Sequence, residues 1–201
     1  MVFWMPYIQN CARKMQIRIS TKSLDVLDHE GLVLGFFSDE RPPRGYCGLV
    51  DWRLNGVIST KMAKGKITGV FMEKVLIAPY QRIPSSKILL FGLGKSTELT
   101  YDTLYMAGYN ISETITKIGC KDFAFDIPVV GRCSLEVPLM TEAMIAGCFD
   151  FLSKDIEELN SVSPCVLGDE SCFDEVVLGL HKFKVSVKER GRVEIIEGIR
   201  T

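Results

Sequence analysis

The sequence predicts an α/β domain in which a mixed β-sheet is covered by helices on both faces. Short apolar segments of strand length alternate along the chain with longer segments of helical periodicity, which is the pattern of strands joined by helices. Hydrophobic residues make up 47% of the 201 residues and charged residues 24%, an ordinary globular balance. A chain of this length buries roughly 70% of its unfolded surface. We therefore expect one domain with a single core.

The first half of the chain supplies four predicted strands and one helix. Alternating polar and apolar residues predict a half-buried strand over residues 15–20, and a nearly continuous apolar run predicts a central strand over residues 31–37. Apolar residues at helical spacing predict a helix over residues 49–63, followed by a glycine and basic residues. Two further strands are predicted over residues 74–78 and 87–92.

The second half continues the alternation of helices and strands. A long helix is predicted to begin after an N-cap at Thr100 and to end at Gly119. Pro138 is acceptable because it falls in the first turn of the next helix. The remaining expectations are a strand at 122–128, helices at 135–152 and 172–188, a helix or turn at 154–160, and strands at 163–167 and 193–196.

Charge and cysteine usage limit the functional classes. The net charge of −1 gives no overall attraction to nucleic acid or to anionic lipid. The cysteines are odd in number and no two are spaced as C-x-x-C, so we expect most of them to be buried thiols in a reducing, cytoplasmic compartment. They are Cys11, Cys47, Cys120, Cys133, Cys148, Cys165 and Cys172. No apolar run has the length of a membrane span, so we expect no membrane insertion.

The predicted domain covers residues 15–201. Residues 1–14 precede the first convincing strand, and Met15 opens that strand. Residues 1–14 are therefore either an N-terminal extension or the product of a misassigned translation start, with Met15 as the true start.

Several segments in the middle of the chain follow one another in a distinctive order. They are a helix ending in the sequence KGKITG at 64–69, the strand and turn at 87–95, the helix at 100–119, the strand at 121–128 and a helix ending in LSK at 152–154. In this order they resemble the N-terminal domain of the leucyl aminopeptidase family, most strongly over residues 32–154. The resemblance implies a three-layer α/β/α fold of the macro-domain type.

The resemblance implies no catalytic residue for this chain. In that family the chemistry lies in a separate C-terminal domain, where lysine, aspartate and glutamate side chains hold two divalent metals and an arginine lies in an Asn-Thr-Asp-Ala-Glu-Gly-Arg motif. The present sequence contains no such motif. We therefore expect no catalytic residue, metal or cofactor of its own. The family's hexamers imply self-association, and a separate catalytic aminopeptidase chain is a possible partner.

Other catalytic constellations have few candidates. The chain has two histidines, His29 and His181, which is too few for a typical zinc or Ser/His/Asp site. Asp25, Asp28, His29 and Glu30 form an acidic cluster that is either a solvated turn or a cation site. Cys172 near a helix start is either inert or a thiol with a lowered pKa.

The candidate ligand site is the turn after the strand at 87–92. A strand-to-helix turn with glycines can present backbone N–H groups to phosphate. This one matches neither the P-loop nor the G-x-G-x-x-G pattern, so it is either a tight turn or a site for a small anionic ligand such as a nucleotide. Macro domains bind ADP-ribose with glycine-rich loops that have no match here, so ADP-ribose is not expected. The residues concerned are Gly92, Gly94, Lys95, Ser96 and Thr97.

Two basic segments are candidate contact surfaces. Arg41 and Arg44 flank two prolines before an aromatic residue, and this loop either contacts a partner or phosphate, or is a solvated connection capped by Tyr46 and Trp52. The last helix ends in basic residues that either complement the helix dipole or contact an acidic partner, while nucleic acid is not expected. These are Lys182, Lys184, Lys188, Arg190 and Arg192.

The sequence thus predicts a non-catalytic relative of the aminopeptidase N-terminal domain that serves assembly, regulation or ligand binding. Two alternatives remain open. One is a macro-like domain that binds a nucleotide or another phosphate ligand. The other is the non-catalytic subunit of a split aminopeptidase.

Overall fold

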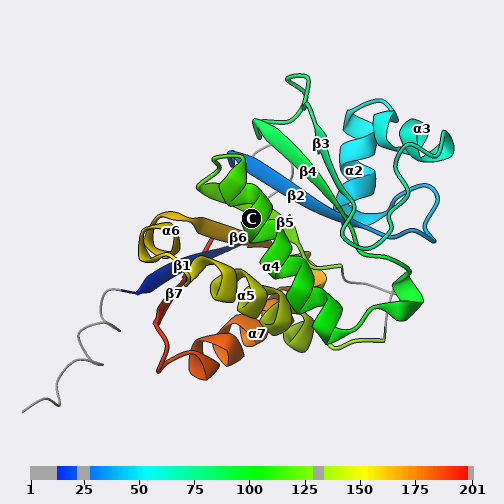
Figure 1. The fold of residues 1–201 in the computed structure, drawn as a ribbon. Helices are drawn as coiled ribbons and strands as arrows, with labels where there is room; N and C mark the ends of the chain where they lie inside the picture. The colour runs from blue at the N-terminus through cyan, green and yellow to red at the C-terminus, as the bar shows by residue number, and fades with distance from the viewer. Residues whose placement is uncertain (1–12, 22–27, 129–133, 199–201) are drawn as a thin grey trace, which may run out of the picture.

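The chain folds around a mixed seven-stranded sheet with helices on both faces (Figure 1). A computed structural model describes residues 13–21, 28–128 and 134–198. The strand order is β3-β4-β2-β5-β6-β1-β7, and β3 pairs with β4 in antiparallel orientation while the other pairs are parallel. The predicted α/β fold with a mixed sheet is confirmed. The strands are β1 (Lys14–Ser20), β2 (Gly31–Phe36), β3 (Lys74–Ile77), β4 (Lys87–Gly92), β5 (Asp122–Asp126), β6 (Ser163–Leu167) and β7 (Arg192–Glu197).

The helices form two layers of unequal size. Alternate residues of β5 face opposite layers: Phe123 and Phe125 join the core with α4, α5 and α7, while Ala124 joins the core with α2 and α3. The larger layer contains α4 (Tyr101–Lys117), α5 (Val137–Leu152) and α7 (Phe173–Ser186), and the smaller contains α2 (Gly45–Arg53) and α3 (Val57–Ala63). Shorter elements are α6 (Ile156–Ser161), η1 (Ser96–Glu98) and η2 (Glu170–Cys172).

The ends of the long helices follow the sequence signals. Thr100 is the N-cap of α4, where the Thr103 amide donates to the Thr100 hydroxyl (3.2 Å) and the Thr100 amide donates to the Thr103 hydroxyl (2.9 Å). Gly119 adopts a left-handed conformation (φ +73°) just after the helix ends. Pro138 lies in the first turn of α5, as expected.

The helices of the larger layer cross at backbone contact. A Cβ atom added to Gly108 of α4 would lie 2.0 Å from the Met144 carbonyl oxygen of α5, and one added to Gly147 of α5 would lie 2.0 Å from the Tyr105 carbonyl oxygen of α4. The same holds for Gly179 of α7, whose added Cβ would lie 2.4 Å from the Pro138 carbonyl oxygen. No side chain larger than hydrogen fits these positions without moving a helix.

The predicted single helix over residues 49–63 was wrong, because the chain turns in its middle. Asn55 and Gly56 both have positive φ angles (+56° and +74°), which end α2 and start α3 in a new direction. The buried carboxylate of Asp51 accepts hydrogen bonds from the Ile58 amide (2.7 Å) and the Ser59 amide (3.0 Å) at the start of α3. The Asn-Gly pair was the sequence signal for this turn.

Three other expectations concern the termini, the thiols and membrane spans. The five described cysteines are buried, as predicted for Cys47, Cys120, Cys148, Cys165 and Cys172. The predicted extension at residues 1–14 lies largely outside the described residues, and Cys11 and Cys133 lie wholly outside them. Among the described helices, none has both the length and the apolar character that crossing a bilayer requires.

Candidate functional site

The carboxyl edge of the sheet is the candidate ligand-binding region. The helices after β2 cover one face of the sheet and the helix after its neighbour β5 covers the other, so the chain connections diverge between these two strands. In open α/β sheets, ligands bind outside the carboxyl ends of the strands at such a point. The candidate residues at 92–97 follow β4, which pairs with β2, and therefore lie at this edge.

Three loops are joined at this edge by backbone hydrogen bonds. The Ser38 amide after β2 donates to the Gly94 carbonyl (2.8 Å), and the Gly94 amide donates to the Gly69 carbonyl (2.9 Å). Gly69 has a left-handed conformation (φ +80°), and an added Cβ would lie 2.8 Å from the Ser38 nitrogen. The loops after β2 and β4 and the loop before β3 therefore form one connected unit.

The predicted anion-binding groups at 92–97 face carboxylates of the protein itself. The Ser96 amide donates to both oxygens of Asp39 (3.0 and 3.1 Å), and the Ser96 hydroxyl donates to Asp39 Oδ2 (2.8 Å). Lys95 Nζ donates to Glu98 Oε1 (2.7 Å). Backbone carbonyls accept the amides of Gly92 and Gly94, from Glu73 and Gly69 respectively. The turn thus presents donors as the sequence suggested, and an internal carboxylate occupies the ones on Ser96.

The titration of Asp39 reflects this contact. Partial burial acts to raise the pKa of its carboxyl group, but the hydrogen bonds from Ser96 and the charge of Lys95 outweigh that effect and hold the pKa below its ordinary value. Asp39 is therefore ionised at neutral pH. Its position beside a backbone amide and a hydroxyl is the environment that a phosphate oxygen would also find favourable.

The two candidate arginines have different surroundings. The Arg41 guanidinium donates to the carbonyl oxygens of Glu40 (2.7 Å), Thr68 (2.8 Å) and Phe37 (3.3 Å), so it joins the same loops at the carboxyl edge. Arg44 is exposed at the N-cap position of α2. Arg41 therefore lies with the turn at 92–97 through the shared loop at 68–69, whereas within the described part of the chain no side-chain hydrogen bond joins Arg44 to that unit.

Sequence reasoning missed a second polar group at the same edge. The carboxylate of Asp126, at the end of β5, is 5% exposed and accepts a hydrogen bond from the Gly35 amide (3.1 Å). Burial, with Asp126 and Asp169 nearby, raises the pKa of Tyr46 to about 12. The Tyr46 hydroxyl donates to the Gly168 carbonyl (3.5 Å). The only sequence signal was a carboxylate at the end of a buried strand.

The loop at 41–52 and Cys172 also differ from some of the expectations. Tyr46 is partly buried, but the expectation that Trp52 caps the loop was wrong, because its side chain is 72% exposed. Burial raises the pKa of the Cys172 thiol, and the thiol donates to the Asp169 carbonyl (3.5 Å). Cys172 is therefore the inert alternative rather than a thiol with a lowered pKa.

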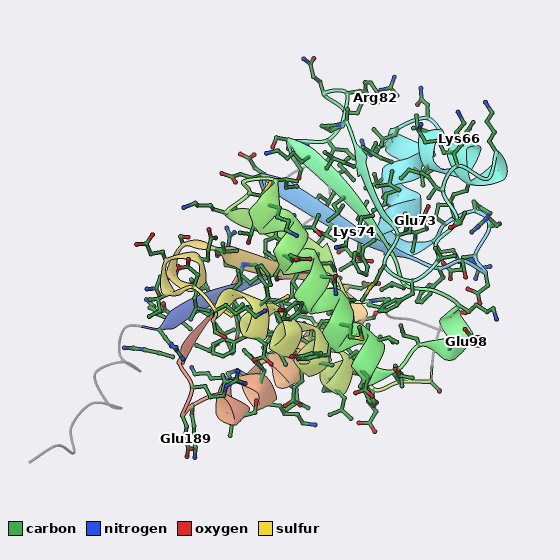
Figure 2. The ribbon with its side chains drawn as sticks, in the orientation of Figure 1. Lys66, Glu73, Lys74, Arg82, Glu98 and Glu189 are labelled. Atoms are coloured by element: carbon green, nitrogen blue, oxygen red, sulfur yellow. The ribbon has the colours of Figure 1, made fainter. Side chains whose placement is uncertain are left out.

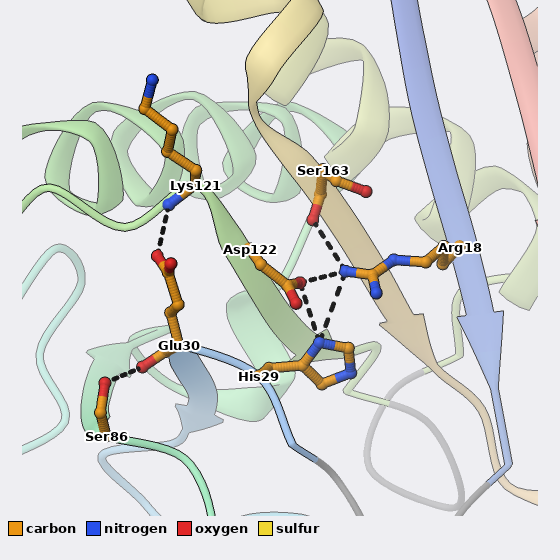
Figure 3. A network of polar contacts seen from close by, with 7 residues as sticks. All are labelled: Arg18, His29, Glu30, Ser86, Lys121, Asp122 and Ser163. Carbon is orange, nitrogen blue, oxygen red and sulfur yellow. Dashed lines mark hydrogen bonds and ion pairs between the residues drawn. The ribbon is translucent and has the colours of Figure 1, made fainter.

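In the acidic cluster at 25–30, His29 is buried while Asp28 and Glu30 are exposed, at the opposite edge of the sheet (Figure 3). His29 Nδ1 lies 2.9 Å from Asp122 Oδ1, and Arg18 forms an ion pair with the same oxygen. The Glu30 carboxylate accepts the Lys121 amide (2.8 Å). His29 is therefore packed, whereas the exposure of Asp28 and Glu30 fits the solvated-turn alternative. Asp25 lies outside the described residues.

Metal binding was tested across the part of the chain that the structure describes. In residues 13–21, 28–128 and 134–198, no three His, Cys, Asp or Glu side chains are grouped so that they could hold a metal ion. A hydrolytic metal centre needs three or more converging ligands and an open position for water.

Comparison with known proteins decides the family. The model of the N-terminal domain of the cytosol aminopeptidase family matches residues 33–152, which is more than half of the chain. The chain belongs to this family. The predicted resemblance, placed at 32–154, is therefore confirmed.

Curated relatives of this aminopeptidase N-terminal domain are much longer proteins. A probable cytosol aminopeptidase of Cyanothece is 26% identical over 57% of this chain and 23% of its own length. One from Roseiflexus castenholzii is 24% identical over 70% of this chain and 29% of its own length. The chain thus spans about a quarter of the length of the relatives it matches.

Solved structures with the same fold come from two groups. Tomato leucine aminopeptidase aligns with a TM-score of 0.55 and 15% identity, over 83% of this chain and 35% of that chain. The macrodomain of Trypanosoma brucei in complex with ADP aligns with a TM-score of 0.64 and 15% identity, over 84% of this chain and 69% of that one. An Oceanobacillus iheyensis macrodomain with ADP aligns with a TM-score of 0.66 and 11% identity, over 84% of this chain and 91% of that one. At these identities the likeness shows the fold alone, and it confirms the macro-domain-like prediction.

The ion pair at the opposite edge gives this aminopeptidase N-terminal domain a pH-dependent stability. Burial acts to raise the pKa of Asp122, but the hydrogen bond and charge of His29 and the charge of Arg18 outweigh it, so the pKa is lowered. The ionised carboxylate then stabilises the fold above the unfolded pKa of about 3.9, and this contribution is lost as the pH falls through the lower folded pKa.

We predict that Asp122→Asn lowers the free energy of unfolding by about 1 kcal/mol at neutral pH, because the amide keeps an oxygen acceptor but loses the charge. Urea denaturation of both proteins at neutral pH and near pH 3 measures the effect, and the difference should shrink in acid. Asp28→Asn, a change at an exposed position beside His29, is the control. A difference of equal size at both pH values would contradict the assignment.

Proposed function

We propose that this chain is a non-catalytic module of the cytosol aminopeptidase family, which acts in assembly or regulation rather than in hydrolysis. The observation that supports the proposal best is that the described residues group no three metal-binding side chains. The buried histidine that would be the natural ligand, His29, is held instead between Asp122 and Arg18.

The proposed role implies a partner that carries the chemistry. The matched curated relatives extend well beyond the region this chain covers, so a catalytic aminopeptidase domain or chain is the partner of first choice. Self-association is a second proposed mode of assembly. Five buried cysteine thiols support a reducing, cytoplasmic location for this module.

The direct test is an assay of the purified chain on leucine p-nitroanilide with added Mn²⁺ or Zn²⁺. We expect no chelator-sensitive hydrolysis above that of the metal-containing buffer, because the described residues group no three metal-binding side chains that could hold an activating ion. A full-length cytosol aminopeptidase is the positive control. Metal-dependent turnover by this chain alone, abolished by a chelator, would refute the proposal.

A nucleotide-binding role is the second candidate, and one specific observation favours it. Two neighbours in fold, the Trypanosoma brucei and Oceanobacillus iheyensis macrodomains, are solved with ADP. In this chain the donors of Ser96 lie at the carboxyl edge and already hold one anionic group, the carboxylate of Asp39. We propose that a phosphate group would compete with Asp39 for these donors.

This competition gives a prediction for thermal unfolding. Millimolar ADP should raise the midpoint of wild-type unfolding slightly and that of Asp39→Ala more, because the variant leaves the Ser96 amide and hydroxyl available to phosphate. Asp102→Ala loses the same charge at the start of α4 and is the matched control. Adenosine, which lacks phosphate, should have no such effect. The turn is not a phosphate site if ADP changes the unfolding midpoint of neither the wild type nor Asp39→Ala. The same conclusion follows if ADP raises the midpoints of Asp39→Ala and Asp102→Ala equally.

A further inference from the structure

The near-zero net charge of the chain conceals two regions of opposite sign. Residues 41–86 contain eight of the 24 Lys and Arg residues but two of the 25 Asp and Glu residues. The rest of the chain therefore has 16 basic residues against 23 acidic ones. Within it, residues 155–181 contain seven acidic residues and no Lys or Arg. The net charge of the chain does not reveal this separation of basic and acidic segments.

The two carboxylates of the basic segment do not neutralise its surface. Asp51 is buried, and its carboxylate accepts the amides of Ile58 and Ser59. The Glu73 carboxylate accepts the Thr68 amide (2.9 Å) and hydroxyl (2.9 Å), and also the Gly69 amide. Both carboxylates are therefore engaged in holding the backbone, and the charge that this segment presents to solvent is positive.

Four basic residues around α2 and α3 have no acidic partner within the described part of the chain. They are Arg44, Lys61, Lys64 and Lys66, and all are exposed. Arg82, from the loop between β3 and β4, donates to the Arg53 carbonyl (3.3 Å) and so adds a charge beside the end of α2. Lys66 and Arg82 both project away from the body of the molecule (Figure 2).

Large apolar groups are exposed among these charges. On α2, Leu49 is 54% exposed and Trp52, one turn later, is 72% exposed. The Arg53 guanidinium lies 5.2 Å from the centre of the Trp52 ring. Tyr80, in the connection that carries Arg82, is 68% exposed. We call Arg44, Leu49, Trp52, Lys61, Lys64 and Lys66 the basic lobe.

We propose that the basic lobe docks an acidic protein partner other than this chain. The partner's carboxylates would face Lys61, Lys64 and Lys66, and its apolar groups would cover Leu49 and Trp52. Exposed Trp and Arg side chains are the types that dominate binding energy at protein interfaces, and opposite charge steers the encounter. The inference rests on charge and exposure, and it does not depend on what the partner catalyses.

A protein fits this surface better than a nucleic acid does. Most contacts of nucleic acids are made through phosphate and sugar, which reward cations but offer no apolar pocket to a leucine. Leu49 and Trp52 project from the same side of one helix, which is the arrangement of anchors for an apolar groove. The charge pattern then requires that the rim of this groove be acidic.

Trp52 supplies the signal for the test. The chain contains two tryptophans, Trp4 and Trp52, so Trp4→Phe leaves Trp52 as the single tryptophan, which excitation at the red edge of the absorption band selects over the six tyrosines. The probe is a synthetic peptide of glutamate and leucine in equal parts. We expect a saturable blue shift of Trp52 emission that weakens with added salt. The combined change Lys61→Glu, Lys64→Glu and Lys66→Glu should weaken binding by about tenfold or more.

A matched control separates the lobe from net charge. Lys182→Glu, Lys184→Glu and Lys188→Glu make the same charge change at exposed positions of α7 and beyond its end, and should leave the affinity nearly unchanged. Leu49→Ser should weaken binding of the glutamate–leucine peptide but not binding of poly-glutamate of equal length. Circular dichroism establishes that each variant is folded. The proposal is supported if binding saturates, depends on the basic lobe and is tighter for the leucine-containing probe.

Four results would overturn it. The first two are the absence of peptide binding and an equal loss of peptide affinity in the α7 control variant. The third is tighter binding of a duplex DNA fragment than of the peptide. The fourth is salt-sensitive self-association in sedimentation that the Lys→Glu substitutions in the basic lobe abolish. The third result would assign the surface to nucleic acid and the fourth to a second copy of this chain. None of them depends on the aminopeptidase assay, so this inference and the proposed function fail independently.

Discussion

Backbone contact between α4, α5 and α7 is the constraint on which the rest of the structure depends. Gly108 and Gly147 let α4 and α5 touch main chain to main chain, and Gly179 lets α7 do the same against the first turn of α5. At this separation the phenylalanines of β5 and the apolar face of α4 fill one continuous core. The Glu136 amide also donates to the Tyr101 hydroxyl (3.2 Å), which links the start of α5 to the start of α4.

Fixing the starts of these helices fixes the loops at the carboxyl edge. Because α4 begins just after η1, the turn at 92–97 has little freedom, and its hydrogen bonds to Ser38 and Gly69 join it to two other loops. Carboxylates complete the arrangement: Asp39 holds Ser96, and Glu73 holds Thr68 and Gly69. The edge is thus organised by internal anions.

Much of the fold could be predicted from the sequence because its signals are local. The strand β4 and the capping of α4 by Thr100 follow from apolar runs and turn residues a few positions apart. The break at Asn55-Gly56 was also a local signal, but the apolar spacing of residues 49–63 favoured one helix over it. The glycine crossings depend on which helices become neighbours, and no short-range pattern specifies that.

The candidate site was less accessible to sequence reasoning for the same reason. The donors of the turn at 92–97 were found, but their acceptor, Asp39, lies 57 residues from Ser96 along the chain. His29 and Asp122 are 93 residues apart, so sequence reasoning could not find the partner of His29. The charge separation was present in the sequence throughout, and averaging over the whole chain concealed it.

We propose that the described residues of this domain hold no hydrolytic metal centre. The most direct measurement is an anomalous difference map from crystals of the chain soaked in Zn²⁺ or Mn²⁺. The account predicts no ordered metal held by three or more protein side chains. An ion bound in that way, within a cleft and with an open position for water, would contradict it.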